Sequence, residues 1–348
     1  MKTIKSNSHS LHIVMFIVLS LVLCLALLVF LSFGTAEISF RETIRIISGG
    51  IFSRTFSEDI NQSHIYILWQ VRMPRVIISI LVGMALAAAG TVFQAIFLNP
   101  MSDPFILGIS SGAAFGVALG AVTGFMVLIP GIWGLPISAF VGAIIATLLI
   151  YFLSGKMQTS TSSLLLSGIA MNFFLSSLMS MLLYFNRDRI ENIIFWSMGS
   201  FSSANWDKCL IGLPIILLGI LSLFYFRREL DLLLIGDESA RTMGLSLKRV
   251  RIILLIISTL ITAAAVSISG IIGFVGLIIP HIIRMIVGPK HRVMLPYAIL
   301  AGGFFTLCAD TFARSILPSS EIPVGIITSL AGAPFFIYLL RNKRREIL

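Results

Sequence analysis

VIISILVGMALAAAGTVFQAIF, residues 76–97, is a stretch of the chain without a single charged side chain. A helix of about 20 apolar residues crosses the roughly 30 Å hydrocarbon core of a bilayer, so this stretch predicts a transmembrane helix. Two further apolar runs are Leu11 to Phe33 and Ile252 to Ser269. The composition agrees, because 57% of the residues are hydrophobic and only 11% are charged, against about 25% charged residues in soluble domains. The predicted fold class is therefore all-α, in a polytopic membrane protein.

Polar residues, proline and glycine divide the 348 residues into about ten apolar spans. These are 11–33, 72–97, 105–124, 134–153, 162–184, 208–226, 250–269, 271–287, 292–313 and 322–341. An even number of spans places both termini on one side of the membrane. If that side is the cytoplasm, 16 of the 25 Lys and Arg lie inside with six acids, and nine lie outside with nine acids. The positive-inside rule favours this orientation.

The net charge of +10 therefore lies at the cytoplasmic face and indicates topology. No basic cluster interleaved with aromatic residues forms a soluble patch, which argues against nucleic-acid binding.

A signal peptide is the alternative for the first span, since Lys2 and Lys5 precede it. Its apolar run exceeds the usual length of roughly 7 to 15 residues, so we interpret it as a retained span. The cysteines show neither CxxC nor metal-ligand spacing, and we expect neither disulfides nor a metal site.

Glycines recur every four residues along the third span, at positions 108, 112, 116, 120 and 124. Small residues at this spacing let two helix backbones approach closely in lipid, so we expect tight helix packing there. Two external connections stand outside the bundle pattern. One is 34–65, with a predicted surface helix from Ile38 to Ile47, and the other is 185–207.

Ionisable residues are nearly absent from the inner parts of the spans. Carriers coupled to a proton or sodium gradient normally place such residues there to bind the coupling ion. Asp310 and Arg314, four residues apart near an external helix end, favour a local ion pair over a coupling site. The chain also lacks a GxxxxGK[ST] phosphate loop. Active transport would then draw on an ATPase in a separate subunit.

Three blocks of sequence resemble the FecCD family of permeases for ferric siderophores, haem and cobalamin. They are RMPRVIISILVGMALAAAGTVFQAIFLNPMSDPFILGISSGAAFG (72–116), SGIIGFVGLIIPHIIRMIVGPKHR (269–292) and ADTFARSILPSSEIPVGIITSLAGAPFFIYLL (309–340). In GDESARTMGLSLKRVR (236–251), Glu238, Ala240 and Gly244 match the E-x-A-x-x-x-G core of the cytoplasmic loop that permeases of ATP-binding-cassette (ABC) importers insert into their ATPases. The resemblance assigns ATPase coupling to these residues and to Gly236, which begins the segment.

The resemblance implies the type II ABC importer permease fold, with one transmembrane domain over residues 1–348 and a cytoplasmic coupling loop at about 227–251. It implies a second permease subunit, identical or different, two ATP-binding subunits and an extracytoplasmic substrate-binding protein. It also implies a multi-pass protein of the cell membrane that is a transport subunit and not an enzyme. The chain is expected to bind no cofactor, because the partner ATPase uses ATP and Mg²⁺.

Arg72 and Arg75 stand at the outer entrance of the second span, against the positive-inside trend. The family docks its binding protein through permease arginines, and these two match that motif, as does Arg314 at a third position. The resemblance therefore predicts docking through all three. Headgroup snorkelling is the alternative for Arg72 and Arg75.

The resemblance also predicts a cytoplasmic gate and a pathway. The gate positions are Asn99, Pro100, Met101, Thr161 and Ser162, for which helix capping is an alternative role. On the fifth span, Asn172, Ser176 and Ser180 share one helix face at a spacing of four. They are expected to line the pathway, and interhelical hydrogen bonding is the other interpretation.

The function predicted is the permease of an ABC importer that moves a metal chelate into the cytoplasm. A ferric siderophore is preferred as cargo only because the family carries it most often, and haem and cobalamin remain alternatives. A gradient-driven secondary carrier would need a coupling site, for which Asp310 is the candidate. A membrane enzyme would need convergent catalytic groups within the membrane, and the sequence offers none.

Overall fold

The computed structural model describes residues 3–34, 36–50, 60–154, 161–317 and 320–343, and all regular structure within them is helical. Its long apolar helices are α1 (Thr3–Ser32), α4 (Met73–Ile96), α5 (Ile109–Val122), α7 (Gly134–Leu153), α8 (Thr161–Phe185), α10 (Trp206–Tyr225), α13 (Leu247–Ser269), α14 (Val275–Val287), α15 (His291–Ser315) and α16 (Val324–Lys343). Shorter helical segments connect them: α2 (Phe40–Ser48), α3 (Gln62–Tyr66), η2 (Ile67–Arg72), η3 (Pro104–Leu107), α6 (Phe125–Leu128), η4 (Gly131–Trp133), η6 (Arg187–Arg189), α9 (Ile190–Ser197), α11 (Arg227–Leu233) and α12 (Asp237–Thr242).

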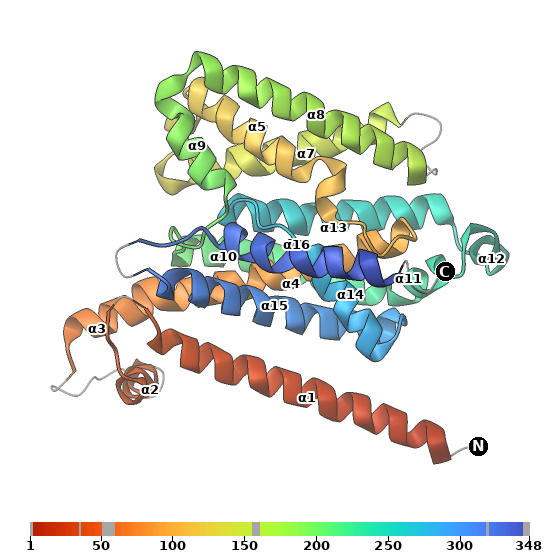
Figure 1. The fold of residues 1–348 in the computed structure, drawn as a ribbon, viewed down its shortest axis with the longest axis horizontal. Helices are drawn as coiled ribbons and strands as arrows, with labels where there is room; N and C mark the ends of the chain where they lie inside the picture. The colour runs from red at the N-terminus through yellow and green to blue at the C-terminus, as the bar shows by residue number, and fades with distance from the viewer. Residues whose placement is uncertain (1–2, 35, 51–59, 155–160, 318–319, 344–348) are drawn as a thin grey trace.

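Every predicted span overlaps one of the long apolar helices. In the described part of the chain, seven helices are long and apolar enough to cross a membrane, and α5, α14 and the apolar part of α16 are shorter. Figure 1 shows the start of α1 and the end of α16 at the same end of the bundle, the end that also carries α12. The all-α polytopic fold with both ends of the chain on one side is confirmed.

The external connections contain more helix than the sequence predicts. The second span begins earlier than residue 72, because α3 and η2 continue into α4 as one helical stretch from Gln62 to Ile96. The side chain of Asn61 starts it by accepting a hydrogen bond from the Ser63 amide at 2.9 Å. The predicted surface helix is present as α2, and the other external connection, 185–207, contains α9.

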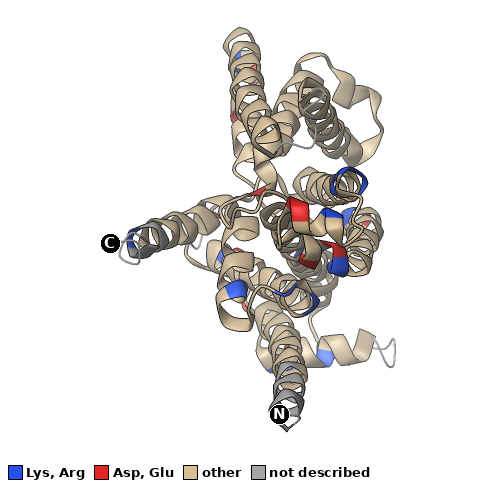
Figure 2. Ribbon diagram, turned by 90° about the vertical axis from the view of Figure 1, so that its right-hand side faces the viewer, with Lys and Arg blue, Asp and Glu red and all other residues tan. Residues whose placement is uncertain are grey.

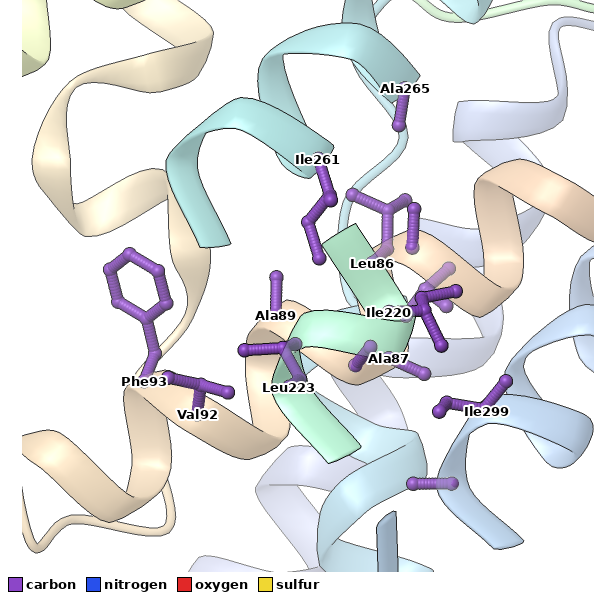
Figure 3. Close-up of a cluster of buried hydrophobic side chains, with 14 of the residues drawn as sticks. Leu86, Ala87, Ala89, Val92, Phe93, Ile220, Leu223, Ile261, Ala265 and Ile299 are labelled. Atoms are coloured by element: carbon purple, nitrogen blue, oxygen red, sulfur yellow. The ribbon is translucent and has the colours of Figure 1, made fainter. Parts of the chain in front are cut away.

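Helix α4 is the centre of the bundle, and α10, α13, α14 and α15 pack around it. Figure 3 shows Val92 and Phe93 of α4 in the same apolar cluster as Leu223 of α10 and Ile261 of α13. A pair of glycines brings the backbones of α4 and α15 together. A Cβ on Gly83 would lie 2.2 Å from the carbonyl oxygen of Gly302. Because lipid tails are as apolar as the side chains, such close packing holds helices together in a membrane.

Helices α5 and α7 form a second closely packed pair. A Cβ on Gly116 would lie 2.3 Å from the carbonyl oxygen of Ser138, and one on Gly142 would lie 2.3 Å from that of Gly112. The predicted glycine stripe therefore acts in close backbone packing at its inner positions. Gly108 and Gly124 flank the helix with φ values of 69° and 73°, where they allow turns instead.

The short helices α11 and α12 lie at the cytoplasmic end. Figure 2 looks onto this end and shows charged residues gathered over one corner of the bundle. Asp231 of α11 accepts a hydrogen bond from the His291 amide at 2.6 Å and so caps α15. Burial by itself raises the pKa of the Asp231 carboxyl, but the hydrogen bonds from His291 outweigh it and the pKa lies below its usual value.

Candidate functional site

A cluster of charged side chains joins α4, α15 and the segment before α16 at the external end. Arg75 donates from Nε and Nη2 to Asp310, with the closest contact at 2.7 Å, and from Nη1 to Glu321 at 2.8 Å. Asp310 is fully buried, while the Glu321 side chain is 36% exposed. The predicted local pair between Asp310 and Arg314 is present at 3.9 Å, but Arg75 is the closer partner.

The other two arginines hold the end of α1. Arg72 donates from Nη1 to the carbonyl oxygens of Leu31 and Ser32, at 2.8 and 3.0 Å, and Arg314 donates to that of Phe30 at 2.7 Å. These carbonyls belong to the last turn of α1, which has no partners for them within the helix. A cation at a helix C-terminus also interacts favourably with the helix dipole. The arginines therefore fasten a helix that is otherwise largely exposed.

The structure thus brings Arg72, Arg75 and Arg314 together, and all three are buried. Headgroup snorkelling does not describe Arg72 or Arg75, because their guanidinium groups bond to protein atoms. Docking of a binding protein stays a prediction. A partner acid would reach this cluster at its open edge, where Glu321 is located.

A cavity of about 710 Å³ opens between η3, α5, α8, α9 and α14, and we call it the pathway cavity. Asn172 and Ser176 line it, together with Ser111 of α5. Asn172 also accepts a hydrogen bond from Ser111 of α5 at 2.6 Å. It therefore agrees both with lining of the cavity and with the alternative role in interhelical hydrogen bonding. Ser180 is exposed on the same helix and donates to the Ser176 carbonyl oxygen at 2.9 Å, but it does not line this cavity.

The predicted gate positions lie at the cytoplasmic ends of α4 and α8. Asn99, Pro100 and Met101 follow α4, and the Asn99 side chain accepts a hydrogen bond from the Met101 amide at 2.9 Å. Thr161 begins α8, and its side chain lies outside the described residues. Ser162 is exposed. The capping of the turn by Asn99 agrees with the alternative role, and gating stays a prediction.

The predicted coupling residues lie on and next to α12 at the cytoplasmic end. Gly236 precedes α12 with φ 98°, and Gly244 follows its C-cap with φ 83°, a backbone conformation that favours glycine. Ala240 is fully buried and fixes α12 on the bundle, whereas Glu238 points to solvent. Met243, 62% exposed, lies at the C-cap of α12. An exposed apolar side chain beside an exposed acid suits contact with another protein.

A second crevice, between α7, α8 and α13, has a different character. Its volume is about 230 Å³, and side chains such as Leu148, Ile256 and Leu260 line it with almost no polar surface. All three side chains are exposed. This crevice suits lipid chains rather than a hydrophilic cargo.

The model of the FecCD transport family matches residues 19–342. The chain belongs to the FecCD transport family. It is 39% identical over 324 residues to the cobalamin import system permease protein BtuC of Halobacterium salinarum, with 90% of this chain and 86% of that protein covered. It is 37% identical over 332 residues to the hemin transport system permease protein HmuU of Yersinia pestis, with 92% and 95% covered.

A solved structure described as an inward-facing conformation of a metal-chelate type ABC transporter matches with a TM-score of 0.82 and 33% identity. It covers 94% of this chain and 99% of that one. This FecCD protein is accordingly a multi-pass permease subunit of an ABC importer of the metal-chelate class. It is a transport subunit and not a catalyst, and separate ATPase subunits hydrolyse ATP.

Sequence reasoning missed several contacts of this FecCD permease. Asp103 lines the pathway cavity and caps η3 by accepting a hydrogen bond from the Phe105 amide at 2.8 Å. Burial raises the pKa of the Asp103 carboxyl to about 6, although the Phe105 amide acts in the opposite direction. The Asp-Pro-Phe order is a capping signal that was available in the sequence. The bond from Arg284 to Gln94, 2.8 Å long, joins helices distant in the chain and had no such signal.

Proposed function

We propose that this permease passes a ferric siderophore from an extracytoplasmic binding protein to the cytoplasm, with haem or cobalamin as the alternative cargo. The observation that carries the proposal is the pathway cavity with Asn172, Ser176 and Ser111 on its wall. Hydroxyl and amide groups contact a hydrophilic chelate without competing strongly for its metal. A cavity of about 710 Å³ also lies within the range of roughly 300 to 1,000 Å³ that ligand sites occupy.

The proposed complex contains two permease subunits, identical or different, two ATPases and the binding protein. ATP binding and Mg²⁺-dependent hydrolysis in the ATPases would shift the permease between outward- and inward-facing states. Exposed Glu238 on α12 and exposed Met243 at its C-cap support this step, because they offer a contact surface on the cytoplasmic side. Asn99, Pro100 and Met101, with Thr161 and Ser162, would close the cytoplasmic exit.

Uptake of radiolabelled ferric siderophore, haem and cobalamin tests the proposal. The vesicles contain this permease, its ATPase and its binding protein, with and without ATP. Uptake of the siderophore that requires ATP and survives an ionophore is the expected result. If haem or cobalamin alone is taken up, the importer function stands, and that compound replaces the siderophore as the proposed cargo. Uptake that needs a gradient and no ATP would overturn the importer, although Asp310 is paired with Arg75 and offers no free carboxylate to a coupling ion.

We also propose that the binding protein docks at the charged cluster. Replacing Arg72 and Arg75 by Glu should weaken docking, but both are buried, so a folding defect must be separated from a docking defect. Glu321→Gln avoids that ambiguity. It removes the partly exposed carboxylate that pairs with Arg75 and does not bury a new charge. The variant should bind the acidic surface of a binding protein more tightly, and unchanged affinity would remove Arg75 from the docking site.

A further inference from the structure

A second large cavity lies at the external end, and we call it the external cavity. Its volume is about 670 Å³, and it lies between the start of α7, helix α9, the start of α10, the end of α13 and the segment before α16. Its polar wall consists of Ser200, Ser202, Ser203, Asn205, Lys208, Ser269 and Glu321. Phe195 and Trp196 add aromatic surface. A concave wall of this mixed kind is typical of small-molecule sites.

Lys208 is the unusual member of this wall. The residue is only 7% exposed, in the first turn of α10. Its Nζ donates one hydrogen bond, to the Ser203 hydroxyl at 2.7 Å. An ammonium group carries three N–H donors, and none of the ion pairs in the described part of the chain includes Lys208. A buried charge without an opposite charge is costly, so this cation lacks the partner that its burial calls for.

The other charges near the cavity do not neutralise Lys208. Glu321 lines the same wall, but its carboxylate accepts from Arg75 at 2.8 Å and 2.9 Å. Asp207 is exposed and is not part of the wall. Lys208 is therefore a cation on the wall that is paired with none of the described carboxylates, in surroundings where burial strengthens its attraction for an anion.

We propose that the external cavity is a subsite for the anionic group of the cargo, and that Lys208 binds it. The cargo class is then a chelate with an ionised carboxylate, catecholate or similar oxyanion, in preference to a chelate without one. Ser200, Ser202 and Ser203 supply neutral hydrogen bonds to the same group. This inference rests on the proposed function, because it assigns charge selectivity to the permease in addition to its binding protein.

Two ferric trihydroxamates that differ by one carboxylate test the proposal. The amine of ferrioxamine B is acetylated to give a neutral chelate, or succinylated to give a carboxylate chelate. ATP-driven uptake of both is measured in vesicles with the complete importer. Binding of both to the purified permease–ATPase complex is measured with radiolabelled iron, without the binding protein. The readout is the ratio of succinyl to acetyl chelate, which cancels differences in expression.

The wild type should favour the succinyl chelate by about tenfold or more in the binding arm, as expected for a charge-assisted hydrogen bond. Lys208→Met should bring the ratio close to one, and Lys208→Arg should retain most of it. Arg41→Met removes one exposed external cation far from the wall and should leave the ratio at its wild-type value. Thermal unfolding of Lys208→Met checks its folding, and we expect an unchanged or higher midpoint because a buried charge is removed.

Equal binding of the two chelates by the wild type, or a preference that survives in Lys208→Met, would overturn the proposal. Failure of the proposed function looks different. If ATP drives no uptake of either chelate, import of this siderophore class fails, while the binding arm still decides whether Lys208 selects anions.

Discussion

Arg75 donates to Asp310 and Glu321, which lie 235 and 246 residues further along the chain. The arginine and Asp310 are buried, so each needs the other to compensate for the loss of water. Sequence spacing indicated only the local partner of Asp310, Arg314, because a contact between distant helices leaves no trace in local periodicity. Asn172 is a similar case, since its polar face was visible in the sequence but its bond to Ser111 was not.

Arg75→Met should lower the free energy of unfolding by about 3 to 5 kcal/mol, because Asp310 is left as a buried charge with Arg314 only at 3.9 Å. Unfolding in detergent, followed by circular dichroism, measures the loss. The double variant Arg75→Met, Asp310→Leu removes both charges and should recover most of it, since apolar replacement of a buried ion pair is often nearly neutral. An equal loss in the single and double variants would show that packing, and not charge, is responsible.

Asp103 should make stability depend on pH near neutrality. The pKa of its carboxyl is about 6 in the folded protein, above the ordinary aspartate value of 3.8, so folding disfavours the charged form. The resulting penalty is absent below about pH 4, grows as the pH rises and is complete above about pH 6. Asp103→Asn keeps the acceptor for the Phe105 amide and should raise the unfolding midpoint at pH 7.5 by a few degrees. The gain should vanish near pH 4; a gain independent of pH would exclude the charge as its cause.

At the scale of elements, apolar runs divided by polar residues, proline and glycine were sufficient to predict the ten apolar helices. The helical extension formed by α3 and η2 was not predicted, because Gln62, Ser63 and His64 are polar. Their backbone nevertheless continues the helix into α4. Helix α12 lies inside the predicted coupling loop at about 227–251. Gly236 and Gly244 have positive φ at its two ends, and the buried Ala240 sets which face remains free.

Glu238→Arg on α12 should leave the fold intact and impair coupling. The side chain is exposed, and surface substitutions usually change stability by less than about 0.5 kcal/mol. In the complete importer, stimulation of ATP hydrolysis by the loaded binding protein should fall severalfold. Arg41→Gln, an exposed change on α2 at the other end of the bundle, is the matched control. Full stimulation in Glu238→Arg would remove this residue from the ATPase contact.

Gly244→Leu tests the turn that ends α12. No atom lies within 4 Å of a Cβ built at this position, so a side chain meets no clash. Its φ of 83° is nevertheless unfavourable for leucine by roughly 1 kcal/mol. The strain should shift the end of α12 and uncouple ATP hydrolysis from uptake, with little change in the unfolding midpoint. Intact coupling would show that the contact with the ATPase does not depend on the position of this turn.

At the scale of the whole molecule, charge fixes the direction of insertion. The net charge of +10 arises from the loops on the side of α12. On the side of the external cavity, the positive and negative charges of the loops are equal in number. The same orientation places Lys208 and the Arg75 cluster where a cargo arrives, and places α12 where ATP is available. The order of sites along the transport direction therefore follows from the distribution of Lys and Arg in the loops.

Cysteine labelling tests this orientation directly. In a chain with Cys24, Cys209 and Cys308 changed to Ser, a single cysteine is introduced at exposed Ser202 or at exposed Ser246. The permease is expressed without its partners, so that no subunit covers either position. A membrane-impermeant maleimide should label Ser202→Cys in right-side-out vesicles and Ser246→Cys only in inside-out vesicles. The reverse pattern would invert the topology, and then Lys208 would face the cytoplasm and could not receive an incoming cargo.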